Sequence, residues 1–339
     1  MSDKMLWELF DKYNYMIHYV RYRKNQFYEK FTGKSHWAMP HIVAGKWLIS
    51  PVRTNQIIEN AILENKPFWV GRFGGTEMNM IYHTLLYRMH PEKDNREDAV
   101  TRLCLLSGFF PKSIELGEKF VDLMLEDCTQ IDLLAEWRRY MEDYIYIKYQ
   151  PYTKLTQLHY IEPWNMYKHP GKKVKPWSAA LKGKKVLVIH PFDESIKKQY
   201  TENRKYLFEK IYCVDDILPE FELITLKAVQ TLAGESDRRF QTWFDALNWM
   251  KEQCRKIEFD VAIIGCGAYG FPLAAEIKRM GKVAIHLGGA TQILFGIIGS
   301  RWEAECSDFC ARVVNNYWTR PMESEKITHA SKVESACYW

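Results

Sequence analysis

The chain has 339 residues, of which 47% are hydrophobic and 26% charged, a composition that is typical of a globular protein and excludes a disordered or fibrous one. The formal net charge of +5 is too small to require a nucleic-acid partner, but it suits a small anionic ligand. No apolar run is long enough to span a membrane, and the first residues lack the apolar core of a signal peptide, so we expect a cytoplasmic protein.

The eight cysteines do not have the spacing that builds a zinc site. Cys306 and Cys310 are one helical turn apart, but no other pair of Cys or His residues nearby completes a set of four ligands. We therefore expect reduced thiols, which are the usual state of cysteine in the cytoplasm.

Residues 1–49 predict a helical N-terminal extension. Apolar and aromatic side chains recur at helical spacing between residues 6 and 20, and Lys and Arg are mixed with aromatic residues up to residue 34. Two interpretations of residues 1–34 stay open. The helix packs on the protein's own core or on a second subunit of a homo-oligomer, or its basic aromatic face makes a peripheral contact with the inner face of the membrane.

Residues 50–320 predict the main domain, and its first part is mostly helical. The pattern indicates a helix over 50–66, a strand over 68–72, a second helix from about Thr76, and mostly helix over 97–148. Residues 150–183 are rich in Pro, Trp and Tyr and show no clear period. Long connections of this kind are often functional.

Beyond residue 184, strands alternate with helices. Strands are predicted over 184–192, 221–229, 259–267 and 282–289, and helices over 195–211, 238–257 and 271–281. The alternation implies a parallel sheet, and the unbroken apolar runs VLVI and VAII suit strands that are buried on both faces. The predicted fold class is therefore α/β, a Rossmann-like open parallel sheet flanked by helices.

Residues 321–339 form a polar tail that ends in Cys337, Tyr338 and Trp339. A tail that is fully solvated has no need of an aromatic ending. We therefore expect this tail to dock on the body of the protein or on a neighbouring subunit.

The segment VAIIGCGAYGFPLA, residues 261–274, carries the spacing Gly-x-Gly-x-x-Gly between a strand and a helix. Such glycines let the main chain approach a phosphate group, and the helix N-terminus offers unpaired N–H groups. NAD would also require an Asp or Glu about twenty residues later, to bind the ribose. The next strand ends instead in His286, and no Arg that would suit NADP is near it. We interpret the turn as a phosphate site, with an NAD(P)-dependent oxidoreductase, or a purely structural turn, as the alternatives.

Four polar or glycine-rich turns follow predicted strands: RFGGTE, VIHPFDES, IGCGAYG and HLGGATQ. In an open parallel sheet the carboxyl ends of the strands line up, and ligands bind in the crevice outside them. One arginine, several carboxylates and two glycine-rich turns would suit a ligand that carries a diphosphate and a sugar. The candidate residues of such a site are Arg72, Gly74, Gly75, Thr76, Glu77, His190, Asp193, Glu194, Gly265, Gly267, Ala268, Tyr269, Gly270, His286, Gly288, Gly289, Thr291 and Gln292.

Over about residues 50–305, the chain resembles the bacterial GT-D type glycosyltransferases. Their N-terminal motif reads R-[FY]-G-D-G-E after a strand, and RFGGTE stands in the same setting here. Their second hallmark is a late strand–loop–helix–strand unit, which resembles FDVAIIGCGAYG…KVAIHLGG. The resemblance implies transfer of a sugar from a nucleoside diphosphate donor, with UDP expected, to a hydroxyl group in surface polysaccharide or glycoprotein biosynthesis. The acceptor would be a glycan, a lipid-linked glycan or a glycoprotein.

One position departs from the family's motif, because Gly75 stands where the family has an Asp that helps to hold a divalent metal. Mg²⁺ and Mn²⁺ prefer several hard oxygen ligands, and Glu77 alone supplies few. Three outcomes stay open. The protein works without metal, or it recruits Asp193 or Glu194 as a ligand, or it has lost transfer activity and is a non-catalytic nucleotide-sugar-binding protein.

We assign catalytic roles to Glu77, Asp193, Glu194 and His190, and donor binding to the other candidates. Each of the three acids also has a structural interpretation, since acids are favoured at helix starts. Both His190 and His286 are candidates for binding the sugar or deprotonating an acceptor hydroxyl. The planar guanidinium of Arg72 would suit a diphosphate.

Overall fold

The computed structural model describes residues 48–339 except 137–141, 151, 169–173, 212–213, 306 and 334–335, and before residue 48 only 2, 4–9, 20, 23–24, 27, 30–31, 42–43 and 46–47. Most of the N-terminal helix predicted over residues 1–34 therefore lies outside the described residues. The same is true of Cys213 and Cys306, whereas the described cysteines are free thiols. Within the described residues, no helix combines the length and the apolar character needed to cross a membrane.

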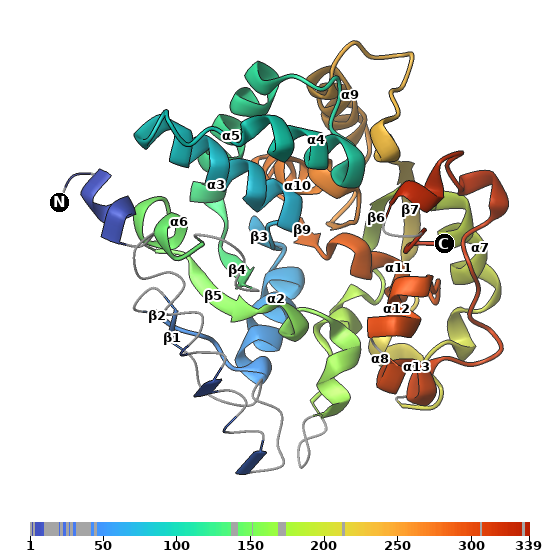
Figure 1. Ribbon diagram of the computed structural model, residues 1–339. Coiled ribbons are helices and arrows are strands. Elements are labelled where there is room, and N and C mark those ends of the chain that lie inside the picture. Colours follow the sequence, from blue (N-terminus) through green and yellow to red (C-terminus); the bar gives the residue numbers. More distant parts are fainter. Residues whose placement is uncertain are drawn as a thin grey trace.

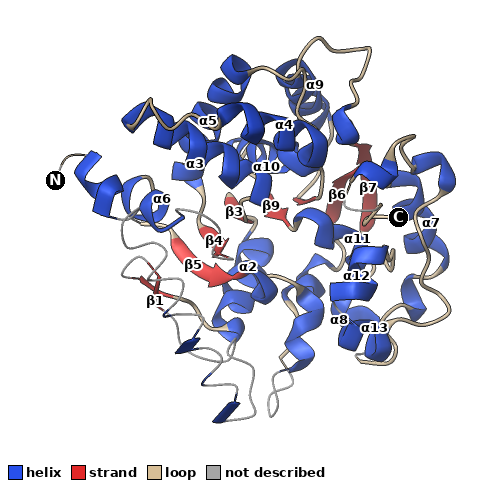
Figure 2. Cartoon of the chain, in the orientation of Figure 1, coloured by secondary structure: helices blue, strands red, loops and turns tan. Residues whose placement is uncertain are grey.

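The centre of the molecule is a seven-stranded sheet in which every pairing is parallel (Figure 2). Its strands are β3 (Phe68–Gly71), β4 (Leu133–Glu136), β5 (Lys154–Gln157), β6 (Lys185–His190), β7 (Glu222–Lys227), β8 (Val261–Ile264) and β9 (Val283–His286). Their order across the sheet is β5-β4-β3-β9-β8-β6-β7, so the last strand in sequence pairs with the first. A separate pair, β1 (Ile42–Val43) and β2 (Lys46–Trp47), is antiparallel.

Helices cover both faces of the sheet, which confirms the predicted α/β class (Figure 1). One face carries α3 (Gly75–Met89), α4 (Arg96–Ser107), α5 (Ile114–Asp127), α6 (Glu142–Lys148), α9 (Trp243–Lys256) and α10 (Gly270–Arg279). The other face carries α2 (Pro51–Glu64), α7 (Asp193–Glu202), α8 (Val214–Ile217), α11 (Thr291–Leu294), α12 (Ser300–Glu305) and α13 (Ser307–Val313).

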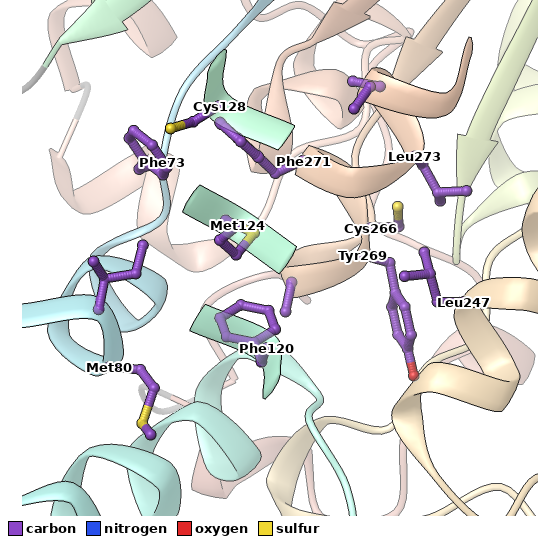
Figure 3. Packing of buried hydrophobic residues seen from close by; sticks show 14 of the residues in the cluster. Phe73, Met80, Phe120, Met124, Cys128, Leu247, Cys266, Tyr269, Phe271 and Leu273 are labelled. Atoms are coloured by element: carbon purple, nitrogen blue, oxygen red, sulfur yellow. The ribbon is translucent and has the colours of Figure 1, made fainter. Parts of the chain in front are cut away.

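Each strand contributes to two hydrophobic cores because successive side chains point to opposite faces of a sheet. In β6, Leu187 and Ile189 enter the core beneath α9 and α10, whereas Val186 and Val188 enter the core on the other face. Figure 3 shows the first core, where the ring of Phe73 lies near that of Phe271. Burial on both sides explains why these strands are unbroken apolar runs.

Short signals in the sequence set the ends of several helices. Ser50 caps α2 by accepting the N–H of Arg53 at 3.3 Å, and Pro51 follows at a position where its missing N–H is not needed. Thr242 and Asp245 form a reciprocal capping box at the start of α9, which begins later than the predicted residue 238. Gly281 follows α10 with a φ of +81°, a conformation that glycine adopts without strain.

The strands predicted over 68–72 and beyond residue 184 are confirmed, but β4 and β5 of the main sheet were not predicted, and neither was the pair β1 and β2 within the extension predicted as helical over residues 1–49. The described part of residues 97–148 is mostly helical, as predicted, but β4 also lies there, and β5 lies in the segment interpreted as a connection. Both strands have four residues, LLAE and KLTQ, as β3, β8 and β9 do, but no glycine-rich turn follows them, and KLTQ is mostly polar. Without a turn signal or an unbroken apolar run, the assignment of such a short strand depends on the strands beside it.

Candidate active site

A cavity of about 920 Å³ opens at the carboxyl ends of the strands. The four turns identified in the sequence all line it, because β3, β9, β8 and β6 are successive neighbours in the sheet. The candidate residues that line the cavity are Arg72, Gly74, Gly75, Thr76, Glu77, His190, Gly265, Gly267, Tyr269, His286, Gly288, Gly289 and Gln292. The candidates outside the lining are Asp193, Glu194, Ala268, Gly270 and Thr291.

Glu77 is buried in the wall of the cavity at the first turn of α3. Its Oε2 accepts a hydrogen bond from the hydroxyl of Thr76 at 3.1 Å, and the hydroxyls of Thr76 and Ser107 are also hydrogen bonded. Because the single hydroxyl proton of Thr76 goes to Glu77, Ser107 donates to Thr76. This chain of donors fixes the direction of the carboxylate, which is a requirement for a group that takes a proton from a substrate.

Arg72 follows β3 directly and lies against the turn after β9. A Cβ atom on Gly288 would lie 2.5 Å from Nη2 of Arg72, so this close approach requires glycine, and Gly288 also has a φ of +60°. Burial lowers the pKa of Arg72 from its ordinary value, and the negative charge of Glu77 opposes that change. The guanidinium nevertheless stays charged, as arginine does in proteins. The cavity thus contains a cation near a carboxylate.

Two buried histidines line the cavity in their neutral form. Burial lowers the pKa of His190 to about 3, and burial together with the charge of Arg72 lowers the pKa of His286 to about 3. Nδ1 of His190 accepts the N–H of Phe192 at 3.0 Å, so the proton of the neutral ring is on Nε2. In this tautomer His190 is a hydrogen-bond donor at Nε2.

Close packing by other segments explains each glycine of the turn between β8 and α10. A Cβ atom on Gly265 would lie 2.5 Å from the Gly288 carbonyl oxygen, and one on Gly267, whose φ is +57°, would lie 2.9 Å from that of Ser107. A Cβ atom on Gly270 would overlap the ring of His286. Tyr269 stacks on Trp243, with ring centroids 5.0 Å apart (Figure 3 shows its buried neighbours). The turn therefore has a structural role whether or not a phosphate binds it.

The two acids after β6 do not face the cavity. Asp193, the first residue of α7, lies 3.1 Å from Lys197 Nζ and 4.0 Å from Lys227 Nζ, and Glu194 is exposed. The main-chain N–H groups of Glu194 and Ser195 donate instead to Glu325, at 2.8 and 3.2 Å. These contacts are those of an ordinary helix start.

The lining also contains charged and polar residues that the sequence patterns did not indicate as site residues, among them Glu162, Arg301 and Tyr338. Glu162 follows β5, and its Oε2 accepts from Asn165 Nδ2 at 2.5 Å and lies 3.3 Å from His159 Nδ1. Nη1 of Arg301, in α12, donates to the hydroxyl of Tyr338 at 3.2 Å. Of these residues, only Tyr338 had a signal in the sequence, which was the aromatic ending of the tail.

The described residues do not suit a divalent metal. They contain no group of three or more His, Cys, Asp or Glu side chains arranged to hold one. Of the carboxylates, Glu77 and Glu162 line the cavity, and each already accepts a hydrogen bond from a neighbouring side chain. Mg²⁺ and Mn²⁺ require more oxygen ligands than this arrangement supplies.

No family model matches the sequence, and no curated protein matches it. Two solved structures are similar to this chain. One is described as the highly conserved domain of unknown function 1792 with a distinct glycosyltransferase fold; the match has 11% identity and a TM-score of 0.35, and covers 71% of this chain and 77% of that one. The other is a selenomethionine-substituted structure of domain of unknown function 1792, with 12% identity, a TM-score of 0.36, and coverage of 71% and 78%. Likeness of this degree carries no conclusion about activity.

Proposed function

We propose that the protein is a glycosyltransferase that binds a nucleoside diphosphate sugar in the cavity, with UDP as the nucleotide, and transfers the sugar to a hydroxyl group. One observation carries the proposal: the buried carboxylate of Glu77 and the guanidinium of Arg72 line the same cavity at the carboxyl ends of the sheet. The volume of about 920 Å³ falls within the range of small-molecule sites.

The two groups suit the two ends of a transfer reaction. The acceptor oxygen forms a bond to the anomeric carbon of the sugar while the bond from that carbon to the phosphate oxygen breaks. Glu77 takes the proton of the acceptor hydroxyl, and the electron pair of the broken bond stays on the diphosphate. Arg72 stabilises the negative charge that develops there, through a planar set of donors that matches phosphate oxygens.

Neutral histidines and main-chain groups would bind the sugar. Nε2–H of His190 is a donor within the cavity wall, and His286 and Gln292 also line it. Because His190 and His286 are uncharged, they can bind hydroxyl groups without adding a second positive charge beside the sugar. In this proposal Asp193 and Glu194 have no part in the reaction.

We propose further that transfer does not require a metal ion. The poor fit of the described carboxylates to Mg²⁺ or Mn²⁺ supports this, and Arg72 supplies positive charge in the cavity. Gly75 stands where the motif of the GT-D type glycosyltransferases has an Asp, and this difference favours a second candidate, a non-catalytic nucleotide-sugar-binding protein. An NAD(P)-dependent oxidoreductase is less well supported, because the strand after the glycine turn ends in His286 with no carboxylate at its end.

We expect the reaction to take place in the cytoplasm, with a glycan, lipid-linked glycan or glycoprotein as the acceptor. The free thiols among the described cysteines are compatible with that compartment. A peripheral contact with the membrane would bring a lipid-linked acceptor to the enzyme. Phe27 and Phe31, whose rings are 4.2 Å apart, are 65% and 69% exposed in the N-terminal segment and could insert among lipid headgroups.

Thermal unfolding tests the class of ligand. UDP or a UDP-sugar should raise the melting temperature, whereas NAD(H) and NADP(H) should not. A ligand present at about one hundred times its dissociation constant adds roughly 2.7 kcal/mol to the free energy of unfolding, which is easily measured. Stabilisation by NADH, together with no effect of uridine, guanosine, thymidine or cytidine diphosphates, would refute the proposal. Binding of UDP-sugars without hydrolysis or transfer would favour the non-catalytic candidate.

A further inference from the structure

The C-terminal segment, residues 336–339, contributes Cys337 and Tyr338 to the cavity wall. Main-chain N–H groups at the start of α12 bind it: that of Arg301 donates to the Cys337 carbonyl at 3.0 Å, and that of Ser300 to the Trp339 carbonyl at 3.3 Å. A Cβ atom on Gly299 would lie 2.7 Å from the main chain of Cys337 and Tyr338, so glycine is required there. Figure 1 shows this end of the chain beside α11, close to the strands that line the cavity.

Tyr338 contacts Arg301, and both residues line the cavity together with Arg72. Its hydroxyl accepts a hydrogen bond from Nη1 of Arg301 at 3.2 Å, and Cζ of Arg301 lies 5.0 Å from the centre of its ring. Burial raises the pKa of Tyr338, so its hydroxyl is uncharged near neutral pH, whereas the positive charge of Arg301 acts on Arg72. Contact with an aromatic face and a hydroxyl restricts the guanidinium of Arg301 to few orientations. Two guanidinium groups, that of Arg72 directly after β3 and that of Arg301 in α12, therefore line one cavity.

The positive charges of Arg72 and Arg301 repel each other, and this repulsion lowers the pKa of Arg72 further after the larger effect of burial. The negative charges of Glu77 and Glu162 raise the pKa of Arg72 and so partly oppose this effect. A ligand with two adjacent anionic groups would bring negative charge to both arginines at once. Arginine binds such groups well, because its donors lie in one plane and match pairs of phosphate oxygens.

We propose that Arg72 and Arg301 together bind a diphosphate group, and that Tyr338 orients Arg301 for it. The inference rests on the proposed function for the choice of a nucleoside diphosphate, since this group is the leaving group of the transfer. Arg301 is then a binding residue and Tyr338 a positioning residue. In this arrangement the second arginine supplies the positive charge that a metal ion would otherwise bring to the diphosphate.

The test is titration calorimetry of the full chain with inorganic pyrophosphate and, separately, with UDP. Arg301→Gln should weaken both by roughly tenfold or more, since a hydrogen bond between charged groups contributes about 1.5–3 kcal/mol. Arg301→Lys keeps the charge but loses the planar set of donors, so we expect an intermediate affinity. Arg312→Gln removes an exposed arginine of α13 and is the matched control, which should bind both ligands as the unchanged protein does.

Tyr338→Phe and Tyr338→Ala separate positioning from simple stability. The first keeps the ring over Arg301 and loses only the hydroxyl, and we expect it to bind within about threefold of the unchanged protein. The second loses both the ring and the hydroxyl, and we expect its affinity for pyrophosphate and UDP to fall on the order of tenfold, well below that of Tyr338→Phe. Melting curves of all variants would identify a loss of fold. A variant that melts early is compared at a temperature well below its transition.

Two results would overturn the inference: pyrophosphate that does not bind the unchanged protein, or Arg301→Gln binding pyrophosphate and UDP as well as Arg312→Gln does. Failure of the proposed function gives a different result. Pyrophosphate binding that depends on Arg301, without binding or turnover of any nucleotide sugar, would leave the diphosphate site standing and refute the glycosyltransferase. Transfer activity that is unaffected in Arg301→Gln would support the glycosyltransferase and refute the role of Arg301 in binding the diphosphate.

Discussion

The carboxylate of Glu77 folds back over the main chain of Gly74, so closely that a Cβ atom on residue 74 would overlap both carboxylate oxygens. Gly74 precedes α3, and Glu77 is in the first turn of that helix. The glycine is therefore required by the position of the carboxylate and not only by the approach of a phosphate. A phosphate-binding loop would need the glycine for the ligand alone.

Replacing Gly74 by alanine should act on the reaction through Glu77. The added methyl group displaces the carboxylate, so we expect Gly74→Ala to lower kcat about as much as Glu77→Gln, on the order of a hundredfold. UDP affinity should stay nearly unchanged in both variants, because arginines bind the diphosphate. Steady-state kinetics and calorimetry measure the two quantities. If both variants kept full kcat, Glu77 would have only the structural role of an acid at a helix start.

Removal of divalent metal should leave most of the activity. We expect donor hydrolysis or transfer in EDTA to stay within roughly a factor of ten of the rate with Mn²⁺, since losing a catalytic metal would remove several kcal/mol of charge stabilisation and each 1.36 kcal/mol is a tenfold change in rate. The measurement is the rate in EDTA and again after Mn²⁺ is added back. Abolition in EDTA with rescue by Mn²⁺ would mean that carboxylates complete a metal site on ligand binding, and Glu162 would be the first to replace.

The two buried histidines should make stability depend on pH. Burial lowers the pKa of His190 and of His286 to about 3, from about 6.5 in the unfolded chain. Their contribution is therefore fully present above about pH 6.5 and is lost as the pH falls from there towards 3. Each histidine should cost about 1.4 kcal/mol per pH unit in that window. Urea unfolding between pH 6.5 and pH 5 should show this dependence, and His190→Gln should reduce the slope by about 1.4 kcal/mol per pH unit; an unchanged slope would contradict the burial of a neutral ring.

The N-terminal segment should separate into a docked part and an exposed part. Trp7 is 1% exposed and packs between Tyr82 and Tyr144, at 5.5 and 5.0 Å between ring centroids, so Trp7→Ala should lower the free energy of unfolding by about 3–5 kcal/mol. Replacing the exposed Phe27 and Phe31 together by serine should leave that free energy unchanged and reduce sedimentation with anionic vesicles. A change of oligomeric mass in the double variant, with vesicle binding intact, would instead identify this face as a subunit contact.

The position of the cavity could be predicted from the sequence because it follows from local patterns. The glycine-rich segments RFGGTE and IGCGAYG each indicate a turn at the end of a strand, and a parallel sheet brings such turns to one edge. The same reasoning could not separate Glu77 from Asp193, since both are acids in the first turn of a helix that follows a strand. Only the tertiary packing turns one towards the cavity and pairs the other with Lys197.

The residues that close the cavity could not be predicted for a different reason. Arg301 and Tyr338 lie 37 positions apart in segments without a regular period, and they meet only because Gly299 lets the chain pass closely. Glu162 lies after β5, whose sequence KLTQ is mostly polar and is not followed by a glycine-rich turn. Contacts of this kind depend on how distant segments pack, and a single sequence records no such pairing.

The order of the strands has a consequence for the chain as it leaves the ribosome. β9 is the last strand of the sheet to be synthesised, yet it lies between β3 and β8 and pairs with both. Until residue 286 has emerged, the group β5-β4-β3 and the group β8-β6-β7 have no strand between them and can form only as separate halves. A nascent chain that stops before Val283 thus exposes the unpaired edges of β3 and β8. Unpaired strand edges of this kind can pair with other chains and lead to aggregation. Translation of one four-residue strand, VAIH, joins the halves into a single sheet.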